Sequence, residues 1–460
     1  MRLRTWLVAV TASAGLAPAV TAASAAASVR TFTLRSGLVE MGGFNTAYPR
    51  EWVRTPRVDG HVVRMHARLV DARGRAVTIR DVMLHHVTFR RQWRPARRVA
   101  CTSGGGEAFY GTGEEDQSLR LPPGYGYRVR RRDRWRMTAM LMSHSPRSVG
   151  VFVEYRVTVD TDRRLTPVHA FWVRANGCET ATVNYPVAGG GPVGSTALQT
   201  YDWRVPYSGR IVAAGGHLHG GARDMWLSQP RCGDRRLLDT RPSYGMPDDL
   251  MYRVRPLLHE PGPMDTRYFE SGTGIAVRAG ETLRLSGAYD GERPHGGVKS
   301  IMHVYVARGA AGPPACHALP ADRRLLRKPG PSRAEPPRVT VPLTGLDARG
   351  RTHTITDLGP ARPLPPDAVV DLGDDGFSVP HATIPAGSRL TWRFVGREPH
   401  NVRLANGPRL IGTPTLRRGA AFRAAFDVAG HYELFCSLHP VTMHEVVDVL
   451  PSGPAAAPVP

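Results

Sequence analysis

Apolar and polar positions alternate with a period of two in many short segments of this 460-residue chain. Apolar residues take every second position over 63–69, 149–159 and 390–394. A half-buried β-strand has this pattern, because its successive side chains point to opposite faces. Glycine and proline are frequent, with 49 and 40 residues, and no apolar stripe of helical spacing lasts more than about two turns. The pattern predicts an all-β protein made of sandwiches or barrels.

Changes in composition divide the chain into segments. Residues 188–195 form a glycine-rich joint. Residues 329–366 are dotted with proline and arginine and have the composition of an extended linker, although 339–358 could form a hairpin. The predicted organisation is a signal peptide (1–28), a first β-sandwich domain (29–190), a second β-sandwich domain (191–320), a Pro/Arg-rich linker (321–366), a C-terminal β-sandwich module (367–450) and a disordered tail (451–460).

The N-terminus has the features of an export signal. A basic start with Arg2 and Arg4 precedes an apolar run over 6–20 and small residues over 22–28. This is the arrangement of a cleavable signal peptide, and the apolar run is too short to span a bilayer. We therefore predict a secreted protein without a membrane span. A retained N-terminal anchor is the alternative.

The formal net charge of +22 is unevenly distributed. Nucleic-acid binding is one interpretation of such a charge. The basic residues are nearly all arginine, however, with Lys299 and Lys328 as the two lysines, and they are not interleaved with aromatic residues. This is typical of a coding bias, so we predict no nucleic-acid partner. Residues 367–450 hold 8 arginines and 9 acidic residues, so a near-neutral module follows a basic body.

The five cysteines divide into two groups. Export favours disulfides, and an odd cysteine needs an explanation. Cys436 has metal-ligand neighbours, so we expect it to stay unpaired. The other four cysteines allow three pairings. We expect Cys101–Cys178 and Cys232–Cys316, because each bridge then closes within one predicted domain.

The C-terminal module carries a metal-binding pattern. Cys436 and His439 lie on one short segment that ends at Met443, and His400 lies upstream. A soft thiolate, two imidazoles and a weak thioether are the ligand set of an electron-transfer copper site. This motif, together with the context over 377–394, resembles the cupredoxins, such as plastocyanin and amicyanin.

The cupredoxin resemblance implies a type 1 (blue) copper in this module. Its equatorial ligands would be His400, Cys436 and His439, and its axial ligand would be Met443. Three residues separate His439 from Met443, where plastocyanin-like loops have four and amicyanin-like loops have two. The axial ligand is therefore the point at which this chain departs from the family pattern.

Two histidine clusters occur in the body. His217 and His219 lie between glycines, and residues i and i+2 of a strand face the same side, so both can bind one ion. His85 and His86 are direct neighbours, which face opposite sides unless a bulge or a strand end intervenes. Taken alone, a cluster of this kind is more often a structural or surface pair of histidines than a metal site.

Together the two clusters resemble the copper type II, ascorbate-dependent monooxygenases, such as the peptidylglycine α-hydroxylating and dopamine β-monooxygenases. Over residues 30–316 the resemblance implies two jelly-roll-like β-sandwich domains, each with one mononuclear copper. The first copper would have an adjacent His-His and a later His as ligands, and the second a His-x-His and a distant Met. The residues in these positions are His85, His86 and His144 for the first copper, and His217, His219 and Met302 for the second.

The same resemblance implies O2 activation at the second copper, with the first supplying the other electron. Peptide-amidating enzymes have an arginine two residues before the His-x-His, where this chain has Gly215, so a C-terminal peptide acid is not the expected substrate. His303 is an alternative ligand to its neighbour Met302. The remaining histidines are expected to be surface or hydrogen-bonded residues; they include His61, His66, His169, His259 and His353.

Other chemistries lack their motifs. The single His-x-His and the residues on either side of Cys436 argue against a multicopper oxidase, and GxSxG, phosphate-loop and HExxH motifs are absent. The predicted function is an exported copper redox protein, whose cupredoxin module feeds electrons to a monooxygenase-like body acting on O2 and a small organic substrate. A redox partner or small reductant would supply the electrons. The alternative is a non-catalytic electron carrier, or a protein for copper storage or delivery.

Overall fold

A computed structural model describes residues 29–92, 101, 106–161, 164–180, 182–310, 316 and 318–451. The predicted signal peptide and nearly all of the predicted C-terminal tail lie outside these residues. Strands dominate the described chain, and its helices are limited to a 3-10 turn (Pro230–Cys232) and α1 (Leu250–Arg253). The prediction of an all-β fold is confirmed. Within the described residues, no helix has the length and apolar character needed to cross a membrane.

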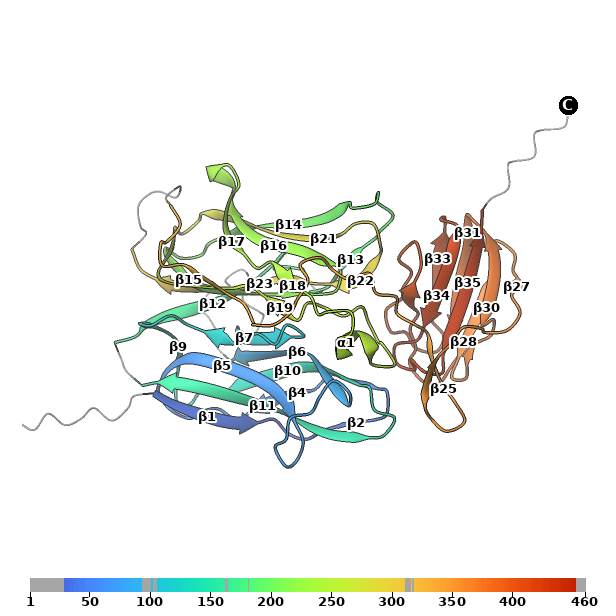
Figure 1. Cartoon of the computed structure of the whole chain (residues 1–460), viewed down its shortest axis with the longest axis horizontal. Coiled ribbons are helices and arrows are strands. Elements are labelled where there is room, and N and C mark those ends of the chain that lie inside the picture. Colours follow the sequence, from blue (N-terminus) through green and yellow to red (C-terminus); the bar gives the residue numbers. More distant parts are fainter. Residues whose placement is uncertain are drawn as a thin grey trace, which may run out of the picture.

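The first half of the body is a β-sandwich, drawn in blue to cyan in Figure 1. Buried residues from both of its sheets, such as Tyr155 on one and Trp135 on the other, form one core. One sheet contains β1 (Val29–Arg35), β2 (Val39–Met41), β5 (Gly60–Val70), β8 (Leu119–Arg120), β9 (Tyr125–Val129), β11 (Val149–Asp160) and β12 (Thr166–Arg174). The other contains β3 (Thr46–Ala47), β4 (Arg50–Val53), β6 (Val82–Arg91), β7 (Glu107–Gly113) and β10 (Trp135–Ser143).

The second half of the body has its own core, but it shares a sheet with the first half. Strand β12 pairs in parallel with β9 and antiparallel with β23, so one 11-stranded sheet runs through both halves. That sheet continues through β15 (Gly209–Leu218), β20 (Tyr268–Val277), β23 (Ser300–Arg308) and β24 (Arg324–Leu326). The facing sheet contains β14 (Thr196–Arg204), β16 (Ala222–Gln229), β17 (Arg235–Asp239) and β21 (Thr282–Asp290). Two small pairs complete this half: β13 (Tyr185–Val187) with β22 (His295–Val298), and β18 (Pro242–Ser243) with β19 (Asp265–Thr266).

The C-terminal module is a separate β-sandwich that lies beside the body (Figure 1). Trp392, Leu390 and Val447 are among the buried residues that join its two sheets. One sheet has the order β27 (Arg362–Pro363), β30 (His381–Pro385), β35 (His444–Leu450), β34 (Gly430–Phe435) and β32 (Arg403–Asn406). The other has the order β29 (Gly376–Phe377), β28 (Val369–Gly373), β31 (Ser388–Phe394) and β33 (Ala421–Phe426).

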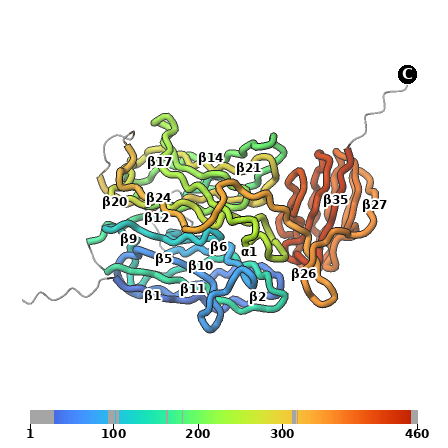
Figure 2. Tube along the Cα trace, in the orientation of Figure 1, coloured from blue at the N-terminus to red at the C-terminus, as the bar shows by residue number. Residues whose placement is uncertain are grey.

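The segment between body and module is packed rather than free, as its path in Figure 2 shows. Its first strand, β24, pairs with β20 of the body. Within 339–358 it forms the predicted hairpin, from β25 (Thr344–Leu346) and β26 (Thr352–Thr354). Val341 packs with Leu257 of the body and Ala405 of the module, and Leu343 packs with Phe435. These contacts hold the module against the body.

The two expected disulfides are present. Cys101 pairs with Cys178, and Cys232 pairs with Cys316. Cys436 is unpaired and buried, as predicted. Its thiol is therefore available as a ligand.

Candidate metal centres

The loop after β34 positions the ligands of the C-terminal site. Cys436 directly follows β34, and Met443 directly precedes β35. The amide of Cys436 donates to the carbonyl of Met443 (3.1 Å), and the amides of His439 and Met443 donate to the carbonyls of Cys436 (3.0 Å) and His439 (3.1 Å). The strand pair and these turn bonds fix both ends of the loop.

Three predicted ligands converge at this loop. Single ligand atoms of His400, Cys436 and His439 lie within 4.8 Å of one another. The Nδ1 atoms of His400 and His439 are 3.2 Å apart, and Cys436 Sγ is 3.6 Å from His439 Nδ1. His400 and Cys436 are almost fully buried, at 1% and 0% exposure. A thiol and two imidazoles at these distances fit one copper ion.

Hydrogen bonds orient the ligands. His400 Nε2 lies 3.0 Å from Asp374 Oδ1, which directs its Nδ1 toward the site. Asn401 Oδ1 accepts from the Ser437 amide (2.9 Å), while its Nδ2 donates to Ser437 Oγ (3.0 Å) and Thr415 Oγ1 (3.2 Å). Asn401 therefore ties the His400 segment to the cysteine loop. Such outer contacts set ligand orientation in metal sites.

Burial raises the pKa of the Cys436 thiol. The Asn401 amide, 3.5 Å from Sγ, acts in the opposite direction. Since metals bind the thiolate, copper binding here has to release that proton. Met443 is fully buried, and its backbone carbonyl accepts from the Cys436 amide. Its axial role stays a prediction.

No protein-family model matches the chain. Amicyanin from Paracoccus versutus is 31% identical over an alignment of 115 positions, which covers 23% of this chain and 85% of that protein. Amicyanin-alpha from Methylorubrum extorquens is 34% identical over an alignment of 74 positions, which covers 15% of this chain and only 62% of the length of that protein. The cupredoxin part of the chain belongs to the amicyanin family.

Solved structures are similar to the same small share of the chain. A purple cupredoxin from Nitrosopumilus maritimus is 26% identical and matches 18% of this chain and 99% of its own, with a TM-score of 0.17. An oxidised amicyanin variant is 29% identical and matches 18% of this chain and 80% of its own, with a TM-score of 0.16. The amicyanin-like part, with its thiolate and two imidazoles, is a copper electron-transfer domain, and we call it the cupredoxin domain.

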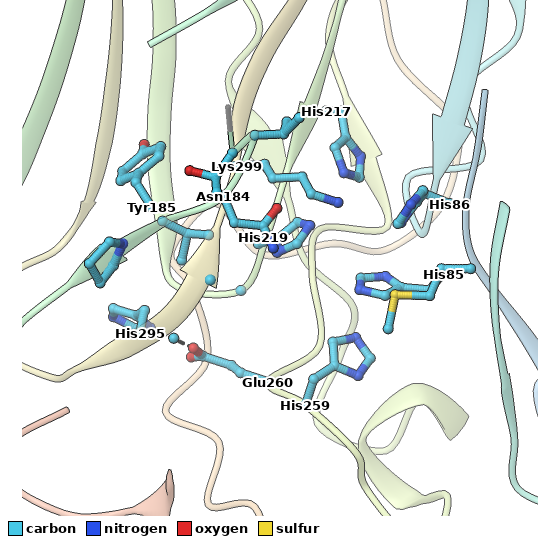
Figure 3. A pocket seen from close by; sticks show the side chains of 18 of the residues that line it. His85, His86, Asn184, Tyr185, His217, His219, His259, Glu260, His295 and Lys299 are labelled. Atoms are coloured by element: carbon cyan, nitrogen blue, oxygen red, sulfur yellow. Dashed lines mark hydrogen bonds and ion pairs between the residues drawn. The ribbon is translucent and has the colours of Figure 1, made fainter. Parts of the chain in front are cut away.

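The body histidines line a cavity of about 1330 Å³ that reaches the cupredoxin domain. His217 and His219 enter it from the end of β15, and His85 and His86 enter it from β6 (Figure 3). The pairing of β6 with β10 skips His85, so a β-bulge lies there. That bulge lets two neighbouring histidines face one cavity, which a regular strand would forbid.

The four predicted histidines form one cluster. The ring centroids of His85 and His86 are 5.3 Å apart, those of His217 and His219 are 5.2 Å apart, and those of His85 and His219 are 5.2 Å apart. His86 Nδ1, His217 Nε2 and His219 Nε2 are buried without a hydrogen-bond partner. Buried ring nitrogens without partners are costly unless they bind an ion. The cluster therefore fits a metal.

Two adjacent glutamates that follow β7 hold histidines of the cavity. Glu115 Oε2 is 3.0 Å from His217 Nδ1, which leaves His217 Nε2 to face the cavity. Glu114 Oε1 is 2.8 Å from His259 Nε2 and 3.1 Å from His85 Nδ1. Burial acts to raise the pKa of Glu114, but His259 and His85 together hold it well below its usual range. A carboxylate that orients a histidine is the usual outer contact of a metal ligand.

His259 is a candidate ligand that the sequence did not reveal. Atoms of His85, Glu114 and His259 lie within 4.8 Å of one another, and the His85 and His259 ring centroids are 4.6 Å apart. Burial, followed by the charge of His259, lowers the pKa of His85 to about 4, so its imidazole is neutral and able to bind metal at pH 7. His259 is hydrogen-bonded to Glu114, as one of the two expectations for it had it, and its position also makes it a candidate ligand.

His144 lies near this group but outside it. Its Nδ1 is 2.8 Å from the Ile79 carbonyl, and it does not line the cavity. Burial lowers its pKa to about 4, and the charges of His259 and Glu114 reach it. Glu114 is the ion-pair partner of His85, and the structure thus places His259, rather than His144, in direct contact with Glu114.

The structure does not bring Met302 to His217 and His219. Met302 is paired with Gly216, whereas His217 is paired with Ile301, so the Met302 side chain points to the opposite face of the sheet. It is fully buried in the core of the second half. Its neighbour His303, the alternative ligand, lines the cavity with a buried Nε2 that has no hydrogen-bond partner.

Proposed function

We propose that the cupredoxin domain passes single electrons to copper ions bound by the body histidines, in an exported protein that activates O2. One observation carries the proposal. Phe435 and Ser437, the residues on either side of Cys436, line the same cavity as His86 and His219. The proposed donor and acceptor thus border one cavity.

The contacts between the domains support this arrangement. Arg409 of the cupredoxin domain donates to the Gly189 carbonyl of the body at 3.1 Å. Apolar contacts of Val341 with Leu257 and Ala405 join the same two parts. A tethered donor held in place acts at a high effective concentration on its acceptor. Electron transfer would then need no diffusional encounter.

The body residues divide into two sets that suit copper. His217, His219 and His303 project into the cavity from the paired strands β15 and β23. His85 and His86 project from β6, with His259 across from them. When bound, copper supplies one-electron and O2 chemistry, while imidazoles suit it as ligands. Glu114 and Glu115 would set the orientation of the rings.

Monooxygenase-like turnover of a small organic substrate is the function we favour for the body. A small reductant or a redox partner would reduce the cupredoxin domain again after each electron transfer. The cavity, of about 1330 Å³, supplies the space for such a substrate. Export is supported by the two disulfides, which persist in oxidising compartments. Copper storage or delivery is the second candidate, because a cluster of neutral histidines would serve it equally.

Copper stoichiometry tests the proposal. The mature chain, starting near Ser28, is loaded with copper and examined for metal content and for visible and paramagnetic spectra. We expect three coppers, one with an intense thiolate band and two nearly colourless. Replacing His85, His86, His217 and His219 with alanine should leave the coloured copper alone, and replacing exposed His353 should change nothing.

A single coloured copper in the unchanged protein would contradict the proposal. Three coppers without reductant-dependent O2 uptake would favour storage or delivery. O2 uptake that continues in the fourfold alanine variant would place the oxygen chemistry elsewhere.

A further inference from the structure

Lys299 places an amine inside the histidine cavity. It lies between β22 and β23 and is only 8% exposed. Figure 3 shows its side chain directed toward His86, His217 and His219. The Tyr289 hydroxyl donates to the Lys299 carbonyl and accepts from the His219 amide (3.1 Å). The fully buried Tyr289 thus fixes Lys299 next to the His-x-His segment.

The Lys299 amine has no counter-ion of its own. Over the residues that the structure describes, its Nζ takes part in no ion pair within 4.0 Å and no hydrogen bond, and Glu114 and Glu115 act on it only through space. Both glutamates are already engaged, Glu114 with His259 and Glu115 with His217. A buried charge without a partner is costly, so its retention calls for a ligand that supplies one.

The other charged side chains that line the cavity are also mostly positive. Arg50, Arg90 and Arg174 line it, and none of the three forms an ion pair with another described residue. Arg90 Nε is buried without a hydrogen-bond partner, and burial, followed by the charges of Arg136, Arg50 and Arg174, lowers the Arg90 pKa. Among the described residues, Glu260 is the acidic residue that lines the cavity, and it is paired with Arg293 and His295.

We propose that Lys299 binds the carboxylate of a small organic substrate in this cavity. The inference rests on the proposed function, since it names the substrate class of the same site. A single ammonium with three donors balances one carboxylate. The surrounding arginines raise the local concentration of anions.

Calorimetric titration of the metal-free full chain tests the inference with benzoate and its neutral analogue benzamide. We expect benzoate to bind the unchanged chain more tightly than benzamide. Lys299→Met should weaken benzoate binding by about tenfold or more, as loss of a charged hydrogen bond does. Arg389→Met, which removes an exposed cation from the cupredoxin domain, should leave it unchanged.

Acetylation of the unmodified chain gives a second measurement that needs no variant. The chain has two lysines, and Lys328 lies outside the cavity lining. Benzoate should slow acetylation of Lys299, followed by mass spectrometry, and should not slow that of Lys328. Equal binding of benzoate and benzamide, unchanged benzoate binding to Lys299→Met, or equal acetylation rates with and without benzoate would each overturn the inference.

These outcomes are separate from those of the proposed function. Benzoate binding is measured without metal, whereas the proposed function depends on copper stoichiometry and O2 uptake. If benzoate binding depends on Lys299 but the protein holds one copper, the proposed anion site stands and the proposed oxygen chemistry is wrong. If the protein holds three coppers but benzoate binding does not depend on Lys299, the copper stoichiometry agrees with the proposed function and the proposed anion site is wrong.

Discussion

Replacing Lys299 with methionine should stabilise the metal-free protein at neutral pH. Burial, only partly offset by Glu115 and Glu114, lowers the Lys299 pKa from 10.5 to about 8. A pKa that is lower in the folded than in the unfolded state means that the folded state binds the proton less well. Each pKa unit corresponds to about 1.4 kcal/mol, so the buried ammonium costs roughly 3 kcal/mol below pH 8.

The sign of the pH dependence follows from the same shift. Between pH 8 and 10.5 the unfolded chain keeps the proton while the folded chain releases it, so the penalty shrinks and the unmodified protein gains stability as pH rises. Methionine has a similar length and no charge. The advantage of Lys299→Met should therefore be complete at pH 7 and nearly gone by pH 10.5.

Differential scanning calorimetry of the metal-free full chain measures this effect. For a unit of the size of the body, about 3 kcal/mol corresponds to a rise in melting temperature of roughly 5 °C. The cupredoxin domain has its own core and serves as an internal reference, because its transition should not move. A lower body melting temperature in Lys299→Met at pH 7, or a rise that persists undiminished at pH 10.5, would refute the reasoning.

Three further predictions concern the metal centres. Asn401→Ala should lower the stability of the cupredoxin domain by about 1–3 kcal/mol, because it leaves buried partners unsatisfied, and should broaden the copper spectrum; unchanged melting and spectra would contradict this. Glu115→Gln should weaken copper binding at His217 by about 10–100-fold in a competition titration with a chelator, without altering the coloured copper. His259→Ala should remove one body copper, measured by metal analysis, while His144→Ala should retain it; the opposite result would restore the ligand set implied by the sequence.

The cupredoxin ligands could be predicted from the sequence because their geometry is largely local. Cys436 and His439 share one short loop between two paired strands, and that spacing already limits how they can meet. The all-β class could be predicted as well, since the period-two pattern depends only on which faces are buried. The disulfide pairing followed from keeping each bridge within one half of the body.

The candidate third ligands proposed for the body could not be predicted in this way. His259 contacts Glu114, which lies 145 residues away in the sequence, and no local sequence pattern indicates such a contact. The choice between Met302 and His303 depends on strand register. A register shift in β15 between Ile211 and Ala213 contributes to that register, and a one-residue change reverses which side chain faces the cavity.

Electron flow between the two parts is the central claim, and rapid mixing with O2 tests it most directly. The copper-loaded full chain is fully reduced without oxygen and then mixed with O2, while the return of the thiolate band at Cys436 is followed. We predict fast recovery in the unchanged chain. Recovery should be much slower after His217→Ala and His219→Ala, in a variant whose static cupredoxin spectrum is normal. Equal recovery rates in the two proteins would contradict the account, because the cupredoxin copper would then be reoxidised without the body.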